Sequence, residues 1–120
     1  MAELKDLLGK TMTSVNNVED KELVFTTTEG KSFKFYHSQD CCESVTIESI
    51  VGDLADLVGE PLLVAEESIS DKNPEGVTME YQESFTWTFY KFATRKGYVD
   101  VRWYGESNGY YSESVDFAEA

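Results

Sequence analysis

The sequence is short of basic residues. It contains ten Lys and Arg against 23 Asp and Glu, which gives a formal net charge of -13 over 120 residues. Nucleic acids and anionic membranes are bound through cationic surface, so this imbalance argues against direct contact with either. It favours a basic partner protein, or cations, as the binding partner.

Long apolar runs are missing as well. No stretch approaches the length of a membrane span, and the opening MAELKDLLGK carries charges that a signal peptide would not. No internal repeat, low-complexity segment or long linker divides the chain. With 41% hydrophobic and 13% aromatic residues, there is enough material for a core. We therefore expect one folded, cytoplasmic domain over residues 1–120.

Cysteine and histidine are scarce and lie together. The only histidine, His37, and both cysteines, Cys41 and Cys42, fall within the six residues HSQDCC. Neighbouring alpha carbons are about 3.8 Å apart, which is closer than the roughly 4.4 to 6.8 Å of ordinary disulfides. Because the chain has no third cysteine, we expect two free thiols in a reducing compartment.

This crowding permits three interpretations. His37, Asp40, Cys41 and Cys42 offer the ligand types of a structural zinc ion, with Asp40 as the weakest of the four. There is no CxxC pair, however, so the filling of the core by one cysteine stays open. Catalysis is least favoured, because acidic surroundings keep a thiol protonated and the sequence has no nucleophile elbow or phosphate-binding loop. We do not expect an enzyme.

Alternation of apolar and polar residues predicts mainly β-strands. The clearest are SFTWTFYKFAT and YVDVRWYG, which RKG joins into an aromatic-rich antiparallel hairpin. Two short helices are expected, one at about residues 3–9 and one in VGDLADLVGEP, where Asp53 lies near the start and Gly59 near the end. The predicted class is α+β, with a twisted, mainly antiparallel sheet of about six to seven strands. The other candidate strands are 11–18, 21–28, 32–37, 44–50, 62–68 and 112–117.

The middle third is the most acidic part. Between Asp40 and Glu83 there are twelve acids and one base, Lys72. Exposed acids there would imitate the phosphates of a nucleic acid, although a solvated face that keeps the protein soluble is the plainer interpretation. The candidate partner-binding acids are Asp53, Asp56, Glu60, Glu66 and Glu67.

A second candidate surface is WYGESNGYYSES, residues 103–114. Tyr104, Tyr110 and Tyr111 beside Glu106 resemble the rigid aromatic anchors of protein interfaces. Aromatic pairing across the strands of a sheet explains the same residues equally well.

Four runs carry a family resemblance: YHSQDCCESV, GDLADLVGEPLLVAEE, SFTWTFYKFAT and KGYVDVRWYGESNGYYSESVDF. They resemble an uncharacterised family of short acidic proteins encoded in bacteriophages, prophages and bacterial genomes. Small acidic phage proteins are often inhibitors of host defence, including anti-CRISPR proteins, and this chain is similar to them in size and charge. The resemblance implies a host partner in the bacterial cytoplasm.

These observations lead to a functional expectation. We expect a non-enzymatic inhibitor that binds a basic nucleic-acid-processing protein, such as an RNA-guided nuclease with its positively charged channel. The alternative is a protein that sequesters a small molecule or signal nucleotide. Its phosphate contacts would come from the bases near the hairpin, Lys91, Arg95, Lys96 and Arg102.

Overall fold

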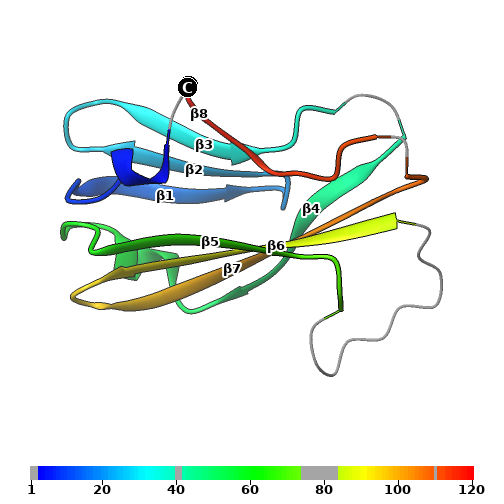
Figure 1. Cartoon of the computed structure of the whole chain (residues 1–120). Helices are drawn as coiled ribbons and strands as arrows, with labels where there is room; N and C mark the ends of the chain where they lie inside the picture. Colours follow the sequence, from blue (N-terminus) through cyan, green and yellow to red (C-terminus); the bar gives the residue numbers. More distant parts are fainter. Residues whose placement is uncertain (1–2, 40–41, 74–83, 110) are drawn as a thin grey trace.

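The chain forms two stacked β-sheets (Figure 1). The computed structural model describes residues 3–39, 42–73, 84–109 and 111–120. Within these ranges it has eight strands, two short 3-10 turns and no α-helix. The elements are η1 (Leu4–Asp6), β1 (Met12–Val18), β2 (Glu22–Thr27), β3 (Ser32–Tyr36), β4 (Ser44–Val51), η2 (Leu54–Leu57), β5 (Val64–Ser70), β6 (Ser84–Thr94), β7 (Gly97–Ser107) and β8 (Asp116–Glu119).

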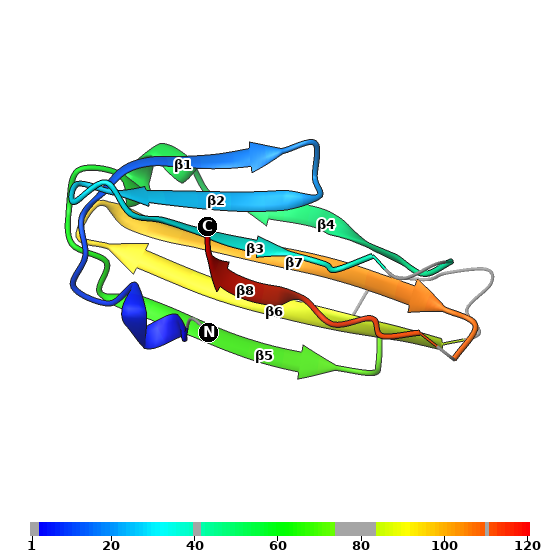
Figure 2. The same ribbon diagram turned by 90° about the horizontal axis from the view of Figure 1, so that it is seen from above.

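Each sheet has four antiparallel strands. The first has the order β1-β2-β3-β8 and the second the order β4-β7-β6-β5. The chain enters the second sheet at β4 and returns to the first at β8. Seen from above, the strands of both layers run along the long dimension of a body that measures 42 × 30 × 23 Å (Figure 2).

The hairpins follow the turn residues of the sequence. Glu19 and Asp20 join β1 to β2 with positive φ angles of 53° and 60°, and the Asn17 side chain bonds both the backbone and the carboxylate of Asp20. β6 and β7 pair along their whole length, from Ser84 opposite Ser107 to Thr94 opposite Gly97. The predicted antiparallel strands and the long C-terminal hairpin are therefore confirmed.

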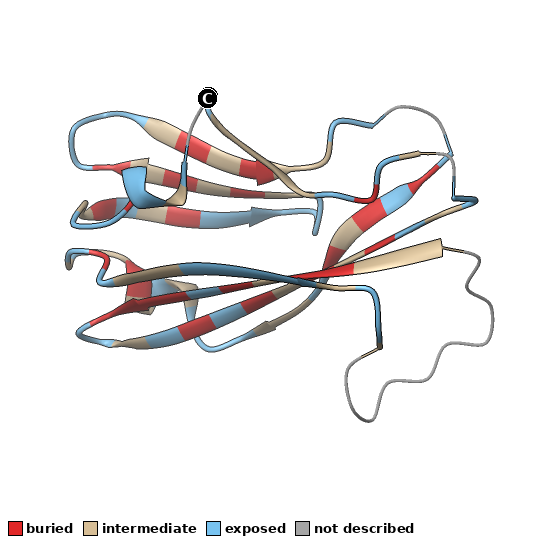
Figure 3. Cartoon of the chain, in the orientation of Figure 1, coloured by how far each residue is buried: buried red, intermediate tan, exposed pale blue. Residues whose placement is uncertain are grey.

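The core lies between the two sheets. Buried residues alternate along β2 and β3 of the first sheet and along β7 of the second, as the two-residue period of a strand requires (Figure 3). Aromatic rings make the contact: the ring centroids of Phe25 and Phe92 are 5.0 Å apart and those of Phe35 and Tyr90 are 4.6 Å apart. η1 and η2 close one end of this core through Leu7 and Leu57, which have no exposed surface.

The prediction of an α+β fold is wrong. The two expected helices are single 3-10 turns, because each segment leaves the helical path after one turn. After η1, the amide of Gly9 donates to the carbonyl of Leu62 at 2.8 Å instead of continuing a helix. After η2, Gly59 has a φ of 87°, a left-handed value that glycine adopts at little cost. One turn is too short to be stable alone, so burial of Leu7 and Leu57 holds both in place.

The expected single sheet of six to seven strands is also wrong. Alternation shows which residues share a face, but it does not show which strands pair or that they separate into two layers. The last strand lies later than predicted, at Asp116–Glu119, because residues before it cross β7. An added Cβ at Gly105 would lie 2.6 Å from the carbonyl oxygen of Glu113, so this crossing requires a glycine.

Trp103 offers a test of this core. Its ring is completely buried, so Trp103→Ala should lower the free energy of unfolding by about 3 to 5 kcal/mol in urea titrations. Tyr98→Ala on the same strand is the control, since Tyr98 is 64% exposed and should change stability by less than about 0.5 kcal/mol. Equal losses would contradict the layer assignment. Tyr110, expected from the sequence to be an exposed anchor, lies outside the described residues.

Candidate functional site

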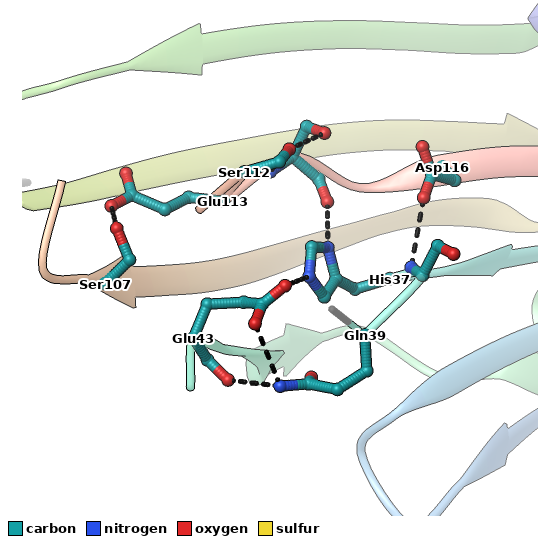
Figure 4. Close-up of polar contacts among 9 residues, drawn as sticks. His37, Gln39, Glu43, Ser107, Ser112, Glu113 and Asp116 are labelled. Carbon is teal, nitrogen blue, oxygen red and sulfur yellow. Dashed lines mark hydrogen bonds and ion pairs between the residues drawn. The ribbon is translucent and has the colours of Figure 1, made fainter. Parts of the chain in front are cut away.

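His37 lies in a buried polar network at one end of the sandwich (Figure 4). Its Nδ1 is 2.7 Å from the carbonyl oxygen of Ser114, and its Nε2 is 2.7 Å from Oε2 of Glu43. A carbonyl only accepts, so Nδ1 carries a proton. The two side chains are 4% and 0% exposed, which makes this a buried histidine–carboxylate pair.

The network joins segments that are far apart in the sequence. His37 follows β3, Glu43 precedes β4, and Ser114 precedes β8. The amide of the Gln39 side chain donates to the Glu43 carbonyl at 2.6 Å and to its carboxylate at 3.1 Å. The backbone amide of Ser38 donates to Asp116 at 3.0 Å. These bonds fasten the two sheets together where the chain passes between them.

A second buried carboxylate lies beside this network. Glu113 accepts hydrogen bonds from the hydroxyls of Thr86 at 2.8 Å and Ser107 at 2.5 Å. Its two oxygens therefore have donors from β6 and β7, which anchor the segment that leads to β8. Figure 4 shows the contact with Ser107. Both buried acids have the hydrogen bonds that a structural role requires.

The structure does not assemble the predicted zinc ligands. Asp40 and Cys41 lie outside the described residues, and no group of three His, Cys, Asp or Glu side chains among the described ones could hold a metal ion. The expectation of free thiols is wrong for Cys42, which is disulfide-bonded and exposed. Its exposure also excludes Cys42 as the cysteine that fills the core. Zinc binding stays a prediction.

The other candidate site is a hollow of about 450 Å³ on the outer face of the second sheet. By strand register, two rows of outward-facing residues cross it. One row runs through Val51, Asp100, Lys91 and Glu66, and the next through Ser49, Arg102, Phe89 and Ser68. All four strands contribute, so the sheet itself positions the hollow.

Both bases of the hollow already have contacts. Nε of Arg102 donates to Glu48 at 2.6 Å, and the guanidinium carbon lies 5.1 Å from the centre of the Trp87 ring. Nζ of Lys91 lies 5.1 Å from the centre of the Tyr98 ring. Cation–π contacts and a charge-assisted hydrogen bond stabilise these positions.

The acids of the hollow differ from the bases in their lack of contacts within the described residues. Within the described part of the chain, the carboxylates of Asp100 and Glu66 form no hydrogen bond or ion pair, and both residues are exposed. Glu67, the next residue of β5, belongs to the opposite face and accepts from the Tyr90 hydroxyl at 2.7 Å. Burial, together with this carboxylate, raises the pKa of Tyr90 well above its ordinary value.

An aromatic cluster borders the hollow. Trp87 faces outward by register, yet it is completely buried: the Tyr104 ring lies 4.6 Å away and the indole nitrogen donates to Asn73 at 3.0 Å. Phe89 stacks beside Trp87 with a centroid distance of 6.5 Å and remains half-buried. The outer face is therefore covered over Trp87 and open over Phe89.

The predicted partner-binding residues do not form one surface. Asp53 caps η2 by accepting from the Ala55 amide at 2.9 Å, and Glu60 pairs with Arg95 at 2.7 Å. These acids lie near the turn where β7 begins, whereas Tyr104 and Glu106 lie near its other end, where the Tyr104 hydroxyl donates to Glu106 at 3.1 Å. Asp56 lies in η2 and is half-buried. Tyr111 is half-buried, and Tyr110 is not described.

The His37 network leads to a prediction about stability. Glu43→Ala would remove the buried carboxylate to which the His37 ring and the Gln39 amide are bonded, which should cost about 3 to 5 kcal/mol of unfolding free energy. Glu29→Ala is the control, because the Glu29–Lys10 pair is exposed and should contribute less than about 1 kcal/mol. If urea titrations gave equal changes for the two variants, the network would not fasten the sheets.

Zinc binding is tested by elemental analysis. The protein should be purified without a metal-binding tag and with a reductant, because Cys42 must be a thiolate to bind zinc. Bound zinc close to one equivalent, lost in Cys42→Ser, would support the site. Less than about a tenth of an equivalent of zinc would contradict the prediction of a zinc site.

Comparison with known proteins gives a family. Residues 5–117 match the family described as Domain of unknown function (DUF7448). No curated protein and no solved structure matches the chain. Among the described residues, no helix has the length and apolar character needed to cross a membrane. Because the match covers nearly the whole sequence, the chain belongs to the DUF7448 family.

Proposed function

We propose that this chain is a non-enzymatic binding protein that inhibits a basic nucleic-acid-processing protein by occupying its cationic surface. The observation that carries the proposal is the surplus of 13 acids over bases. Internal ion pairs consume one acid for each base, so they leave this surplus unchanged. A surplus of this size exceeds what solubility needs in a small domain. It attracts cationic surfaces over distances of about a Debye length.

The resemblance to short acidic phage and prophage proteins supports a more specific form of the proposal. An anti-CRISPR-like inhibitor would act in the cytoplasm of a host bacterium on an RNA-guided nuclease. Such a nuclease holds its heteroduplex in a positively charged channel, which an acidic body can enter without base pairing. No catalytic step is required for this inhibition.

The acidic end near η2 is one surface that would take part. Asp53 and Asp56 lie there with Glu60, although the neighbouring Arg95 pairs with Glu60 and the Lys96 ammonium donates to the carbonyl of Val58 at 2.6 Å. These bases offset part of the local charge. Long-range attraction by the whole chain would therefore contribute more to association than this end alone.

The proposal predicts binding that depends on salt. A partner captured from host lysate by the tagged protein should be identified, and its association rate measured at low and high ionic strength. The rate should fall steeply with salt, because exposed charges are screened over about 10 Å at 0.1 M. Asp53→Asn, Asp56→Asn and Glu60→Gln together should slow association further. Asn retains the cap of η2, so melting should change little.

Binding that is indifferent to both salt and the triple substitution would contradict the electrostatic mechanism. The matched control neutralises three exposed acids that lie away from both η2 and the hollow, Glu19, Asp71 and Glu119. If the control slowed association as much as the η2 variant, the total charge rather than the η2 end would determine the rate.

A second candidate function is the sequestering of a small anionic ligand or signal nucleotide. One observation favours it: Lys91 and Arg102, two of the four bases considered for this role, both line the 450 Å³ hollow. The contacts of these bases with Glu48 and Tyr98 weigh against it. Calorimetric titration with a panel of nucleotides separates the two functions, because the inhibitor requires no nucleotide binding.

A further inference from the structure

We infer that the hollow on the outer face of the second sheet binds a basic, partly apolar segment of a partner protein. The identity of that partner as a basic protein rests on the proposed function. The location of the site rests on the shape of the hollow, on its exposed apolar floor and on which of its charged side chains already have partners.

The floor of the hollow is apolar and accessible. Val51 is 63% exposed, and Phe89 is only half-buried although its neighbour Trp87 is covered. A volume of about 450 Å³ is enough for several side chains of a ligand. Exposed apolar surface ringed by polar side chains is typical of protein-binding sites.

The charged side chains of the hollow determine whether its ligand is cationic or anionic. Arg102 is held by Glu48 and by the Trp87 face, and the Lys91 ammonium lies over Tyr98, so an anion would have to compete with these contacts. The carboxylates of Asp100 and Glu66 have no such contacts within the described residues. The row therefore carries two negative charges on either side of one positive charge, and the complementary ligand is cationic.

The register also sets the spacing of the cations. Asp100 on β7 and Glu66 on β5 belong to one row, with Lys91 on β6 between them. Strands are about 4.8 Å apart, so the two acids are separated by about 10 Å. In a β-strand, residues three positions apart face opposite sides, whereas a polyproline II segment has three residues per turn and rises about 3.1 Å per residue. Two basic residues three positions apart in a polyproline II segment therefore face the same side, about 9 Å apart, and match this distance. Phe89 lies in the neighbouring row and Val51 beyond Asp100 in the same row, so apolar residues beside the two cations would contact them.

A fluorescent peptide tests this geometry. The probe has the core Arg-Val-Val-Arg with neutral flanks and is titrated against the full chain by fluorescence anisotropy. The hollow variant carries Asp100→Asn and Glu66→Gln. The control variant carries Asp71→Asn and Glu119→Gln, which remove the same charge from two exposed acids outside the hollow. The hollow variant should bind about tenfold more weakly, a loss of about 1.4 kcal/mol, and the control less than about twofold.

Changes in the peptide provide an independent measurement. Replacing both arginines by glutamine should abolish binding, and moving them next to each other should weaken it several-fold. Val51→Ser should also weaken binding by about threefold, because it removes part of the apolar floor. These comparisons keep the test valid even if the hollow variant were to unfold, which melting curves would reveal.

Three results would overturn the inference. They are no binding of the probe by the unmodified chain at about 1 mM, equal weakening by the hollow and control variants, and displacement of the probe by a nucleotide that binds Lys91 and Arg102. The proposed function fails separately. If a captured basic partner bound the hollow variant as tightly as the unmodified chain, only the inference would be contradicted. If the peptide bound but no basic partner were captured, only the proposed function would be contradicted.

Discussion

The contact between the two sheets is the interaction on which the rest of the structure depends. In the described part of the chain, neither four-stranded sheet has an α-helix to cover it, so each buries one face against the other. The rings of Phe25 and Phe35 in the first sheet meet those of Phe92 and Tyr90 in the second. This contact fixes which side of every strand is inside. The outer face of the second sheet is thereby left available for the hollow, and the sheets need fastening where the chain crosses between them.

That fastening uses polar groups where apolar ones would be expected. At the end where β3, β4 and the segment before β8 meet, the His37–Glu43 pair and the hydrogen bonds of Glu113 replace apolar contacts. Buried polar groups stabilise only a geometry in which every donor meets an acceptor, so they specify one relative position of the sheets. His37, the predicted zinc ligand, has both ring nitrogens in such hydrogen bonds. This structural role depends on Ser114, which is distant from His37 in the sequence, so the sequence pattern around His37 does not predict it.

Much of the local structure could be predicted from the sequence, and its arrangement in layers could not. The RKG turn locates the C-terminal hairpin correctly, since Thr94 lies opposite Gly97 where β6 and β7 meet. On β6, however, both faces carry aromatic residues, with Trp87 outward and Phe92 inward, so alternation does not show which face enters the core. The hollow was missed for a related reason. Asp100 and Arg102 were visible as the polar face of a strand, but only the pairing of β5, β6 and β7 places Glu66 in the same row.

The excess of acids explains why the positions of the bases do not indicate an anion-binding site. With 23 acids and ten bases, six of the bases contact an acid or an aromatic ring, as Arg102 contacts Glu48 and Trp87. Acids without a partner are common on such a surface, so an unpaired acid alone indicates nothing. The hollow differs because its two unpaired acids lie beside the half-buried Phe89 and the exposed Val51, apolar residues that water solvates poorly. A ligand that covers Phe89 and Val51 would desolvate Asp100 and Glu66 as well, and only a cationic ligand offsets that cost. The apolar floor and the acids therefore select the same kind of partner segment.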